Sequence, residues 1–345
     1  MRTVYSDKHK LRDAKIEIHE GKIVAPFECP RRAEIILERV TSQHLGEVIE
    51  PKAYGLEPVL AVHDAGFVRF LETCASDWAA AGFAGEPMAN CWPTRTMNSP
   101  HIPEMIEGKI GHYALASETT VSEGSWEAAL ASKDVALTAT DLVLGGERTA
   151  FGLCRPPGHH AAVDQFGGYC FLNNAAIAAQ HALDNGAQKI AILDVDFHHG
   201  NGTQQIFYGR DDVLFLSIHG DPMHAFPYFL GHADETGEDA GQGFNVNYPL
   251  PPGAPYDVWK AALDQSLARI KAYEADLLIV SLGVDTFEDD PISFFKLESG
   301  DFTDYGRAIA ALNLPTVFLL EGGYAVEQVG VNAVNVLQGF DQASG

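Results

Sequence analysis

Residues 189–199 read Lys-Ile-Ala-Ile-Leu-Asp-Val-Asp-Phe-His-His, and this stretch decides the fold. Its apolar first half has the length and composition of a buried strand, and it runs directly into acidic and histidine side chains. Similar short apolar runs lie at 149–153, 213–218, 276–282 and 316–320. Strands that are apolar throughout are typical of a parallel sheet whose two faces are both covered by helices.

Helical patterns separate these apolar runs. Residues 174–184 are rich in alanine, and Gly186 is suited to end that helix. Residues 257–273 carry leucine and isoleucine at helical spacing, and Asp257 is the expected N-cap. The alternation predicts a single α/β domain over residues 1–345, with a central, mainly parallel sheet flanked by helices. In such sheets the active site lies at the carboxyl ends of the strands.

The composition restricts the class of protein and its partners. The chain has 345 residues, 46% of them hydrophobic, which is enough to bury a large core. A formal net charge of -24 predicts no affinity for nucleic acid or anionic membranes and an attraction for small cationic substrates; a role in solubility is the alternative. Five scattered cysteines favour a reducing compartment over a disulfide framework. The chain has no apolar signal core and no run long enough to span a bilayer, so we expect a cytoplasmic protein.

Residues 82–105 interrupt the alternation of strands and helices. They carry several prolines and glycines, and the stretch is too long for an ordinary connection. The apolar side chains of Trp92, Met97 and Met105 predict that this arm packs on another surface. We expect it to cover the active site or a neighbouring subunit, and a flexible surface insertion is the alternative.

Three side chains at the ends of two predicted strands form a candidate metal site. Asp196 and His198 are two residues apart, so on an extended backbone they point the same way. Asp285 follows the strand at 276–282. Alone, each would more often be a hydrogen-bonded or structural residue, but together they supply the three ligands and the open position of a catalytic zinc site. Two carboxylates and one imidazole could also hold Fe²⁺ or Co²⁺.

Two further segments carry residues suited to amide hydrolysis. His159 and His160 follow a rigid Pro-Pro-Gly loop and could act as general base and general acid. Asp194 and Asn201 are close in sequence to the ligands and could orient the two rings. Tyr324 follows Gly-Gly after the strand at 316–320, and its phenol could donate a hydrogen bond to an oxyanion. In isolation, such histidines and tyrosines are more often structural.

These segments together resemble one known family. They are Arg-Pro-Pro-Gly-His-His at 155–160, Gly-Gly-Tyr-Cys-Phe-Leu-Asn-Asn at 167–174, Asp-Val-Asp-Phe-His-His-Gly-Asn-Gly-Thr at 194–203, Gly-Val-Asp at 283–285 and Glu-Gly-Gly-Tyr at 321–324. In this order they resemble the histone deacetylases and their bacterial relatives, which share the arginase/deacetylase fold. Residues 285–297 and the proline-rich arm look like the subgroup of bacterial acetylpolyamine amidohydrolases.

The resemblance implies a role for each catalytic residue. One zinc ion per subunit would be bound by Asp196, His198 and Asp285. His159 and His160 would be the base and acid pair, oriented by Asp194 and Asn201, and Tyr324 would polarise the substrate carbonyl. Asn201 departs from family members with aspartate there, so His160 should hold its proton less tightly. Asp194 and Ser217 also match a structural potassium site.

The resemblance also implies a substrate and an assembly. The reaction would be hydrolysis of the acetyl amide of acetylated polyamines or small diamines, giving acetate and a free amine. Gly168, Tyr169 and Phe226 match positions that wall a narrow tunnel, although the two aromatic residues could be ordinary core. Glu107 and Glu118 match acidic positions that would attract a cationic substrate, although both could be solvated helix surface. A homodimer through the arm is expected.

Three alternatives remain at this point. A lysine deacylase acting on acetyl-lysine peptides or proteins would use the same chemistry. An arginase-like site with two manganese ions would need further carboxylates, but the same-face neighbours of Asp285 are Gly283 and Phe287, which cannot bind metal. A sensor that binds acylated amines without turnover is disfavoured by the complete set of ligands, histidines and tyrosine.

Overall fold

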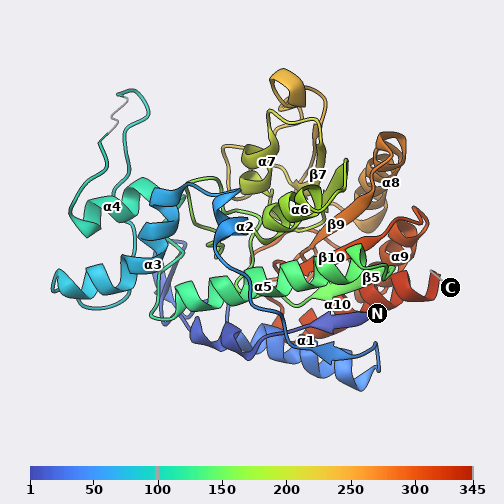
Figure 1. Cartoon of the computed structure of the whole chain (residues 1–345), viewed down its shortest axis with the longest axis horizontal. Coiled ribbons are helices and arrows are strands. Elements are labelled where there is room, and N and C mark those ends of the chain that lie inside the picture. The colour runs from blue at the N-terminus through green and yellow to red at the C-terminus, as the bar shows by residue number, and fades with distance from the viewer. Residues whose placement is uncertain (98–100, 344–345) are drawn as a thin grey trace.

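The computed structural model describes residues 1–97 and 101–343, and within them eight strands form one central sheet. The strand order is β4-β1-β5-β10-β9-β6-β7-β8, and every neighbouring pair is parallel (Figure 1). The strands are β1 (Arg2–Val4), β4 (Val48–Ile49), β5 (Thr149–Gly152), β6 (Ile190–Asp194), β7 (Val213–Gly220), β8 (Asn245–Leu250), β9 (Leu277–Leu282) and β10 (Thr316–Leu320). The predicted parallel sheet is therefore confirmed.

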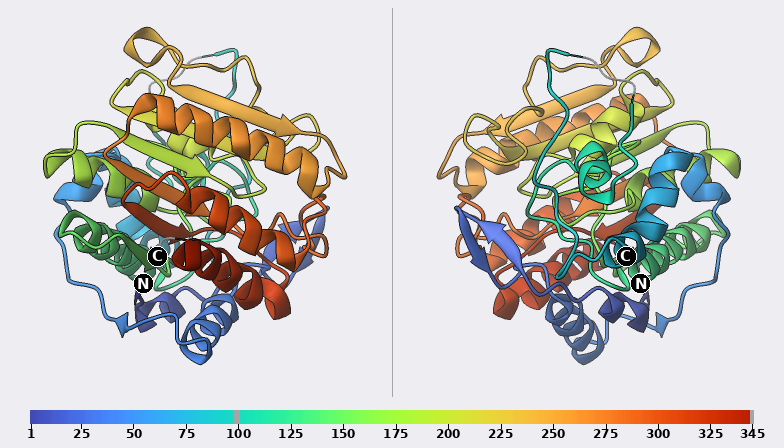
Figure 2. Two further views of the ribbon diagram at one scale, coloured as in Figure 1. Left: turned by 90° about the vertical axis from the view of Figure 1, so that its right-hand side faces the viewer. Right: turned by 90° about the vertical axis from the view of Figure 1, so that its left-hand side faces the viewer.

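Helices cover both faces of this sheet (Figure 2). One face packs against α1 (Pro30–Ser42), α8 (Tyr256–Tyr273), α9 (Ser299–Ala310) and α10 (Val326–Ala343). The other packs against α2 (Glu57–Leu60), α3 (Ala65–Ala80), α4 (Ile106–Tyr113), α5 (Ser125–Leu144), α6 (Asn174–Asp184) and α7 (Asn201–Phe207). Among the described residues, none of the helices combines the length and apolar character that crossing a bilayer requires.

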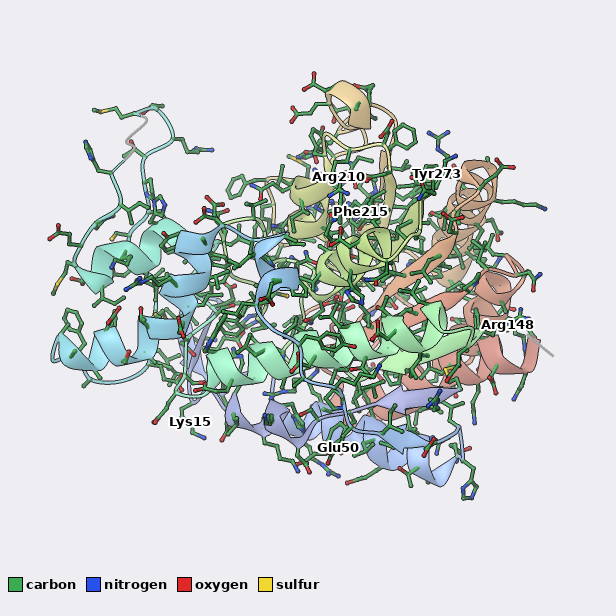
Figure 3. The ribbon with its side chains drawn as sticks, viewed as in Figure 1. Lys15, Glu50, Arg148, Arg210, Phe215 and Tyr273 are labelled. Atoms are coloured by element: carbon green, nitrogen blue, oxygen red, sulfur yellow. The ribbon has the colours of Figure 1, made fainter. Side chains whose placement is uncertain are left out.

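The central strands are apolar on both sides because each side chain meets a helix layer. In β6, Ala191 and Leu193 join the core beneath α1 and α8 to α10, whereas Ile190 and Ile192 join the core beneath the other helices. Figure 3 shows Phe215 inside the molecule, and its side chain is almost fully buried. This two-sided burial explains the continuous apolar runs of the sequence.

The observed ends of α6 and α8 can be compared with the predicted ones. Helix α6 has the predicted bounds, the side chain of Asn173 accepts a hydrogen bond from Ala176 N (2.9 Å), and Gly186 follows in a left-handed conformation (φ +107°). The prediction that Asp257 is the N-cap of α8 is wrong. Pro255 occupies that position, because its extended backbone leads the chain into the helix before Asp257. Asp257 lies in the first helical turn, where a carboxylate favours the positive end of the helix dipole.

The arm at residues 82–105 lies beside α3 and α4, away from the sheet (Figure 1). Trp92 Nε1 donates a hydrogen bond to the carbonyl oxygen of Ala114 (2.9 Å), which fixes the first half of the arm to the molecule. Met97 and Met105 remain exposed, at 76% and 53%. Residues 98–100, which include one of the arm prolines, lie outside the described residues.

Candidate active site

The carboxyl ends of β6 and β9 bring the three predicted metal ligands together. The two strands pair with Asp194 opposite Ser281, so the residues that follow them lie at the same edge of the sheet. His198 Nδ1 lies 3.0 Å from Asp285 Oδ2 and 3.3 Å from Asp196 Oδ1, and all three side chains are buried. One imidazole nitrogen and two carboxylates therefore converge on one point.

Backbone groups hold the two carboxylates in place. Gly322 N donates to Asp196 Oδ2 and Phe197 N donates to Asp285 Oδ1, both at 2.8 Å. A side chain at position 322 is excluded, because a Cβ there would lie 2.5 Å from Asp285 Oδ2 and 2.6 Å from Asp196 Oδ2. Burial, together with the neighbouring Asp196, raises the pKa of Asp285. Two adjacent buried carboxylates need a compensating cation, and this nitrogen and oxygen donor set suits zinc.

The two histidines of the Pro-Pro-Gly loop differ in their hydrogen-bond partners and in the direction of their pKa shifts. Burial alone would lower the pKa of His159, but the carboxylates of Asp194, whose Oδ2 lies 2.9 Å from His159 Nδ1, and Asp196 raise it well above its ordinary value. His160 Nδ1 donates instead to the amide oxygen of Asn201 at 2.7 Å, and burial lowers the pKa of His160 well below its ordinary value. This direction agrees with the expectation that His160 holds its proton less tightly, which stays a prediction.

A buried carboxylate fixes the loop that presents this histidine pair. Glu321 Oε2 accepts hydrogen bonds from Gly158 N (2.6 Å) and His159 N (3.1 Å). Potential ligand atoms of Glu321, His159 and Cys170 also lie close together. Cys170 Sγ, however, donates to the carbonyl oxygen of Gly168 (3.3 Å), so these groups already serve the loop structure.

Tyr324 lies against the cavity at the carboxyl end of β10. Its backbone N–H donates to Asp290 Oδ2 (2.7 Å), and the guanidinium of Arg32 stacks 4.7 Å from the centre of its ring. Burial raises the pKa of Tyr324 well above its ordinary value. The phenol therefore stays protonated near neutral pH, as a hydrogen-bond donor to substrate must.

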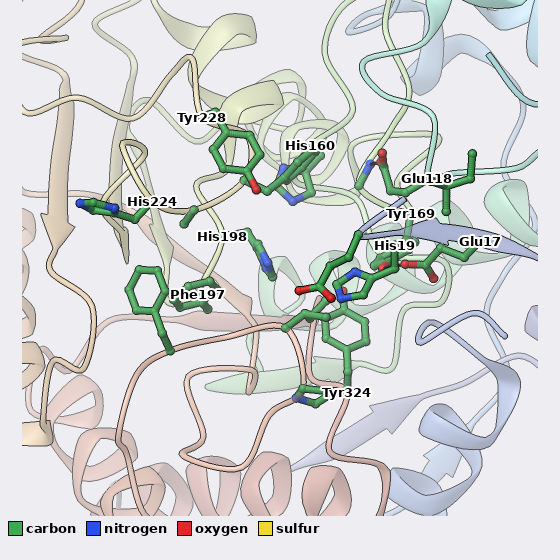
Figure 4. A pocket seen from close by; sticks show the side chains of 18 residues that line it. Glu17, His19, Glu118, His160, Tyr169, Phe197, His198, His224, Tyr228 and Tyr324 are labelled. Atoms are coloured by element: carbon green, nitrogen blue, oxygen red, sulfur yellow. Dashed lines mark hydrogen bonds between the residues drawn. The ribbon is translucent and has the colours of Figure 1, made fainter. Parts of the chain in front are cut away.

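A cavity of about 460 Å³ opens in front of these groups (Figure 4). It is lined by Glu17, Ile18, His19, Glu20, Glu118, His160, Gly168, Tyr169, Phe197, His198, His224, Ala225, Phe226, Tyr228, Pro291, Ile292, Phe294 and Tyr324. Gly168 must be glycine, because its φ is +55° and a Cβ would lie 2.1 Å from His160 Cδ2. The ring of Phe226 stands edge-on to that of His160, with centroids 5.1 Å apart.

Four of the five residues predicted to contact the substrate line the cavity, and one does not. Gly168, Tyr169, Phe226 and Glu118 line the cavity. Glu107 does not: it is exposed on α4 and accepts a hydrogen bond from Asn90 Nδ2 (3.2 Å). Of the described arm residues, none lines the cavity. That the arm covers the active site or a neighbouring subunit stays a prediction. Residues 17–20 also line the cavity, and no sequence pattern predicts this, because a short polar hairpin leaves no periodic signal.

A network of buried charges beneath the site was also missed. The carboxylate of Glu28 binds Arg155 through two hydrogen bonds of 2.7 and 3.1 Å, and Arg32 lies 3.2 Å from it. Arg12 is the third buried guanidinium, at 3.8 Å. Arg32 also donates to the carbonyl oxygens of Glu321 (2.7 Å) and Gly323 (2.5 Å), which ties the network to the segment that carries Tyr324.

Asp194 and Ser217, the residues matched to a potassium site, lie opposite each other in the pairing of β6 with β7. Asp194 Oδ1 accepts a hydrogen bond from Asp196 N (3.1 Å), and Ser217 Oγ lies 2.8 Å from His219 Nδ1. Both side chains are fully buried. The carboxylate of Asp194 therefore contacts both the ring of His159 and the backbone of Asp196.

Comparison with known proteins agrees with this geometry. Residues 26–340 match the histone deacetylase domain. The chain belongs to the histone deacetylase family. It is 57% identical to the acetylpolyamine amidohydrolase of Mycoplana ramosa over 339 residues, covering 98% of this chain and 99% of that protein. It is 54% identical to acetylpolyamine amidohydrolase 1 of Pseudomonas aeruginosa over the whole of both chains.

A solved structure extends the likeness to three dimensions. The acetylpolyamine aminohydrolase from Burkholderia pseudomallei superposes with a TM-score of 0.95 at 38% identity, covering 100% of both chains. The arginase/deacetylase fold predicted from the motifs is thereby confirmed, and so is the resemblance to this subgroup. As a member of this hydrolytic family, the protein is an amidohydrolase.

Proposed function

We propose that this amidohydrolase removes the acetyl group of acetylated polyamines or small acetylated diamines, releasing acetate and a free amine. The observation that carries the proposal is the lining of the catalytic cavity. Its walls hold the carboxylates of Glu17, Glu20 and Glu118 in front of the buried catalytic groups. Acidic groups in a cleft raise the local concentration of cations, and an acetylated polyamine is a cation beyond its amide. The names of the relatives agree with this substrate class.

Asp196, His198 and Asp285 would hold a zinc ion, which when bound supplies Lewis-acid polarisation of the amide carbonyl and of the attacking water. Fe²⁺ and Co²⁺ accept the same donors. Neutral His160 lines the cavity and takes the proton of the water. Protonated His159 adds positive charge beside the reacting centre. Tyr324 donates a hydrogen bond to the carbonyl oxygen as negative charge develops on it. As the C–N bond breaks, His160 gives the proton that it took from the water to the nitrogen of the departing amine.

The proposal is tested by measuring amine release from N-acetylputrescine, N-acetylcadaverine, acetylspermidines and an acetyl-lysine peptide. We expect the zinc-loaded protein to favour the small acetylated amines. Tyr324→Phe should lower kcat by about 10²- to 10³-fold, because it removes one donor to the oxyanion. Activity mainly on the peptide would move the function to lysine deacylation, and metal binding without turnover would favour a sensor.

Replacing Asn201 by aspartate is expected to move the acid limb of the pH profile. A carboxylate 2.7 Å from His160 Nδ1 would stabilise the imidazolium and raise the pKa of His160. The neutral ring of His160 is the base. As pH falls, His160 of the variant would become protonated, and activity would be lost, at a higher pH than in the parent enzyme. For Asn201→Asp, the acid limb of kcat/KM should rise by about one pH unit, and Asn185→Asp, an exposed control, should leave it unchanged. An unmoved limb would contradict the role of His160.

We infer that two chains associate through the arm. Trp92, Met97 and Met105 are exposed at 42%, 76% and 53%, and contact with a second subunit would bury them. Deletion of residues 84–103 should reduce the native mass measured by analytical ultracentrifugation from two chains to one. It should also broaden substrate preference. An unchanged mass together with an unchanged preference would contradict this assembly.

Two further assignments belong to this proposal. A structural potassium ion would lie beside Asp194 and Ser217, where buried oxygen atoms of adjacent strands come together. A reducing cytosol is the proposed location, because the five cysteines are all free thiols.

A further inference from the structure

A small hairpin outside the central sheet forms one wall of the catalytic cavity. Strands β2 (Glu17–His19) and β3 (Lys22–Val24) pair antiparallel, and four consecutive residues, 17–20, line the cavity. Glu20 and Gly21 make the two-residue turn, with φ of +48° and +74°. Hairpin turns of this kind favour asparagine or glycine, so a glutamate at the tip is unusual.

The hairpin is fixed to the opposite wall through a buried bond. Tyr169 OH donates to Glu17 Oε1 (2.7 Å), and Phe27 N donates to Glu17 Oε2 (3.1 Å). Tyr169 is itself held, since its backbone N–H donates to Thr119 Oγ1 (2.8 Å) and its ring packs edge-on against Tyr324, with centroids 5.5 Å apart. The position of the hairpin tip is therefore set relative to the catalytic tyrosine.

The three carboxylates that line the cavity differ in how they are engaged. Glu17 is buried and accepts the two hydrogen bonds just described. Glu118 Oε1 accepts hydrogen bonds from Gly168 N (2.8 Å) and Thr119 Oγ1 (3.1 Å). Glu20 is exposed, and within the part of the chain that the structure describes no donor binds its carboxylate. Its charge is thus available to a ligand in the cavity.

We propose that Glu20 is a specificity-determining residue that binds the distal ammonium group of the substrate. This inference rests on the proposed function, because it needs a substrate whose acetylated end reaches Tyr324 while a positive charge remains near the cavity mouth. Glu17 is the positioning residue that holds the hairpin in place. Because the distal ammonium is far from the reacting carbonyl, Glu20 binds the ground state and the transition state equally and acts on KM rather than kcat.

The test compares Glu20→Gln with the parent enzyme on two acetamides that share the same four-carbon chain. N-acetylputrescine carries one ammonium group, and N-butylacetamide carries none. Glu20→Gln should lower kcat/KM for N-acetylputrescine about three- to fivefold, mainly through KM, as expected for a solvent-exposed charge pair. It should leave N-butylacetamide unchanged. Glu20→Lys should cause a larger loss on the cationic substrate, and added salt should shrink both effects.

Glu274→Gln is the matched control. Glu274 is also an exposed glutamate in a left-handed conformation (φ +57°), but it ends α8 and does not line the cavity. An equal loss on both amides, or the same loss in Glu274→Gln, would overturn the role of Glu20 while leaving the proposed function intact. Failure of the parent enzyme to hydrolyse any acetylated amine would instead overturn the proposed function itself.

Discussion

Asp285→Asn should remove tight metal binding and lower kcat/KM on the order of 10³-fold, because polarisation by the metal supplies several kcal/mol of transition-state stabilisation. The amide oxygen keeps the shape of the side chain and can still accept the hydrogen bond of Phe197 N. The change therefore removes charge rather than structure. Metal content after dialysis, measured by mass spectrometry, and amine release together check the result.

Thermal unfolding separates metal loss from misfolding. Metal should raise the Tm of the parent enzyme strongly and that of Asp285→Asn little, since a ligand stabilises the state that binds it. In the metal-free parent, the raised pKa of Asp285 means that ionising it costs stability as pH rises above the ordinary range of an aspartate. Metal-free Asp285→Asn should thus be at least as stable at neutral pH. Asp289→Asn, an exposed neighbour, should match the parent enzyme, and undiminished metal content in Asp285→Asn would contradict the ligand assignment.

Glu28→Gln should destabilise the fold by about 3–5 kcal/mol, the range for removing one partner of a buried ion pair. Burial would raise the pKa of Glu28, but Arg155 and Arg32 outweigh it, so the carboxyl is charged in the folded protein. Its loss leaves three buried guanidinium groups without their shared anion. Because its folded pKa is lowered, this stabilisation is present above the ordinary pKa of glutamate and is lost as pH falls through the folded value.

Urea unfolding gives the size of this effect. Glu38→Gln is the matched control, because Glu38 pairs with Arg31 at 2.7 Å on the exposed face of α1. Exposed pairs contribute less than about 1 kcal/mol, so this variant should unfold near the parent enzyme. Arg32 links the network to Tyr324, and Glu28→Gln should also lower kcat. A loss below about 1 kcal/mol for Glu28→Gln would contradict the role given to the network.

The convergence of the candidate metal ligands could be predicted from the sequence, because these residues lie on short motifs at strand ends. Asp196, His198 and Asp285 each follow an apolar run, and parallel strands end at one edge of the sheet. The different partners of the two histidines, the carboxylate of Asp194 for His159 and the amide oxygen of Asn201 for His160, also followed from the motif that carries them.

The N-terminal part of the site could not be read in this way. Strands of three residues, such as β2 and β3, are too short for a periodic signal, so Glu17 and Glu20 gave no sign of facing the cavity. Glu28 meets Arg155 across 127 residues of sequence, and no local pattern encodes such a contact. Glu107 is held by Asn90 of the arm, and the composition of the arm does not determine how the arm folds. The position of Glu107 could therefore not be predicted either.

The place of β10 in the sheet has a consequence for how the protein is made. β10 joins β5 to β9, so until residues 316–320 have left the ribosome, β4, β1 and β5 cannot be joined to the four strands from β9 to β8. Until then the facing edges of β5 and β9 stay open, and open apolar edges invite pairing with other nascent chains. The sheet can therefore close only late in synthesis, and the last strand completes it and delivers Tyr324 in the same step.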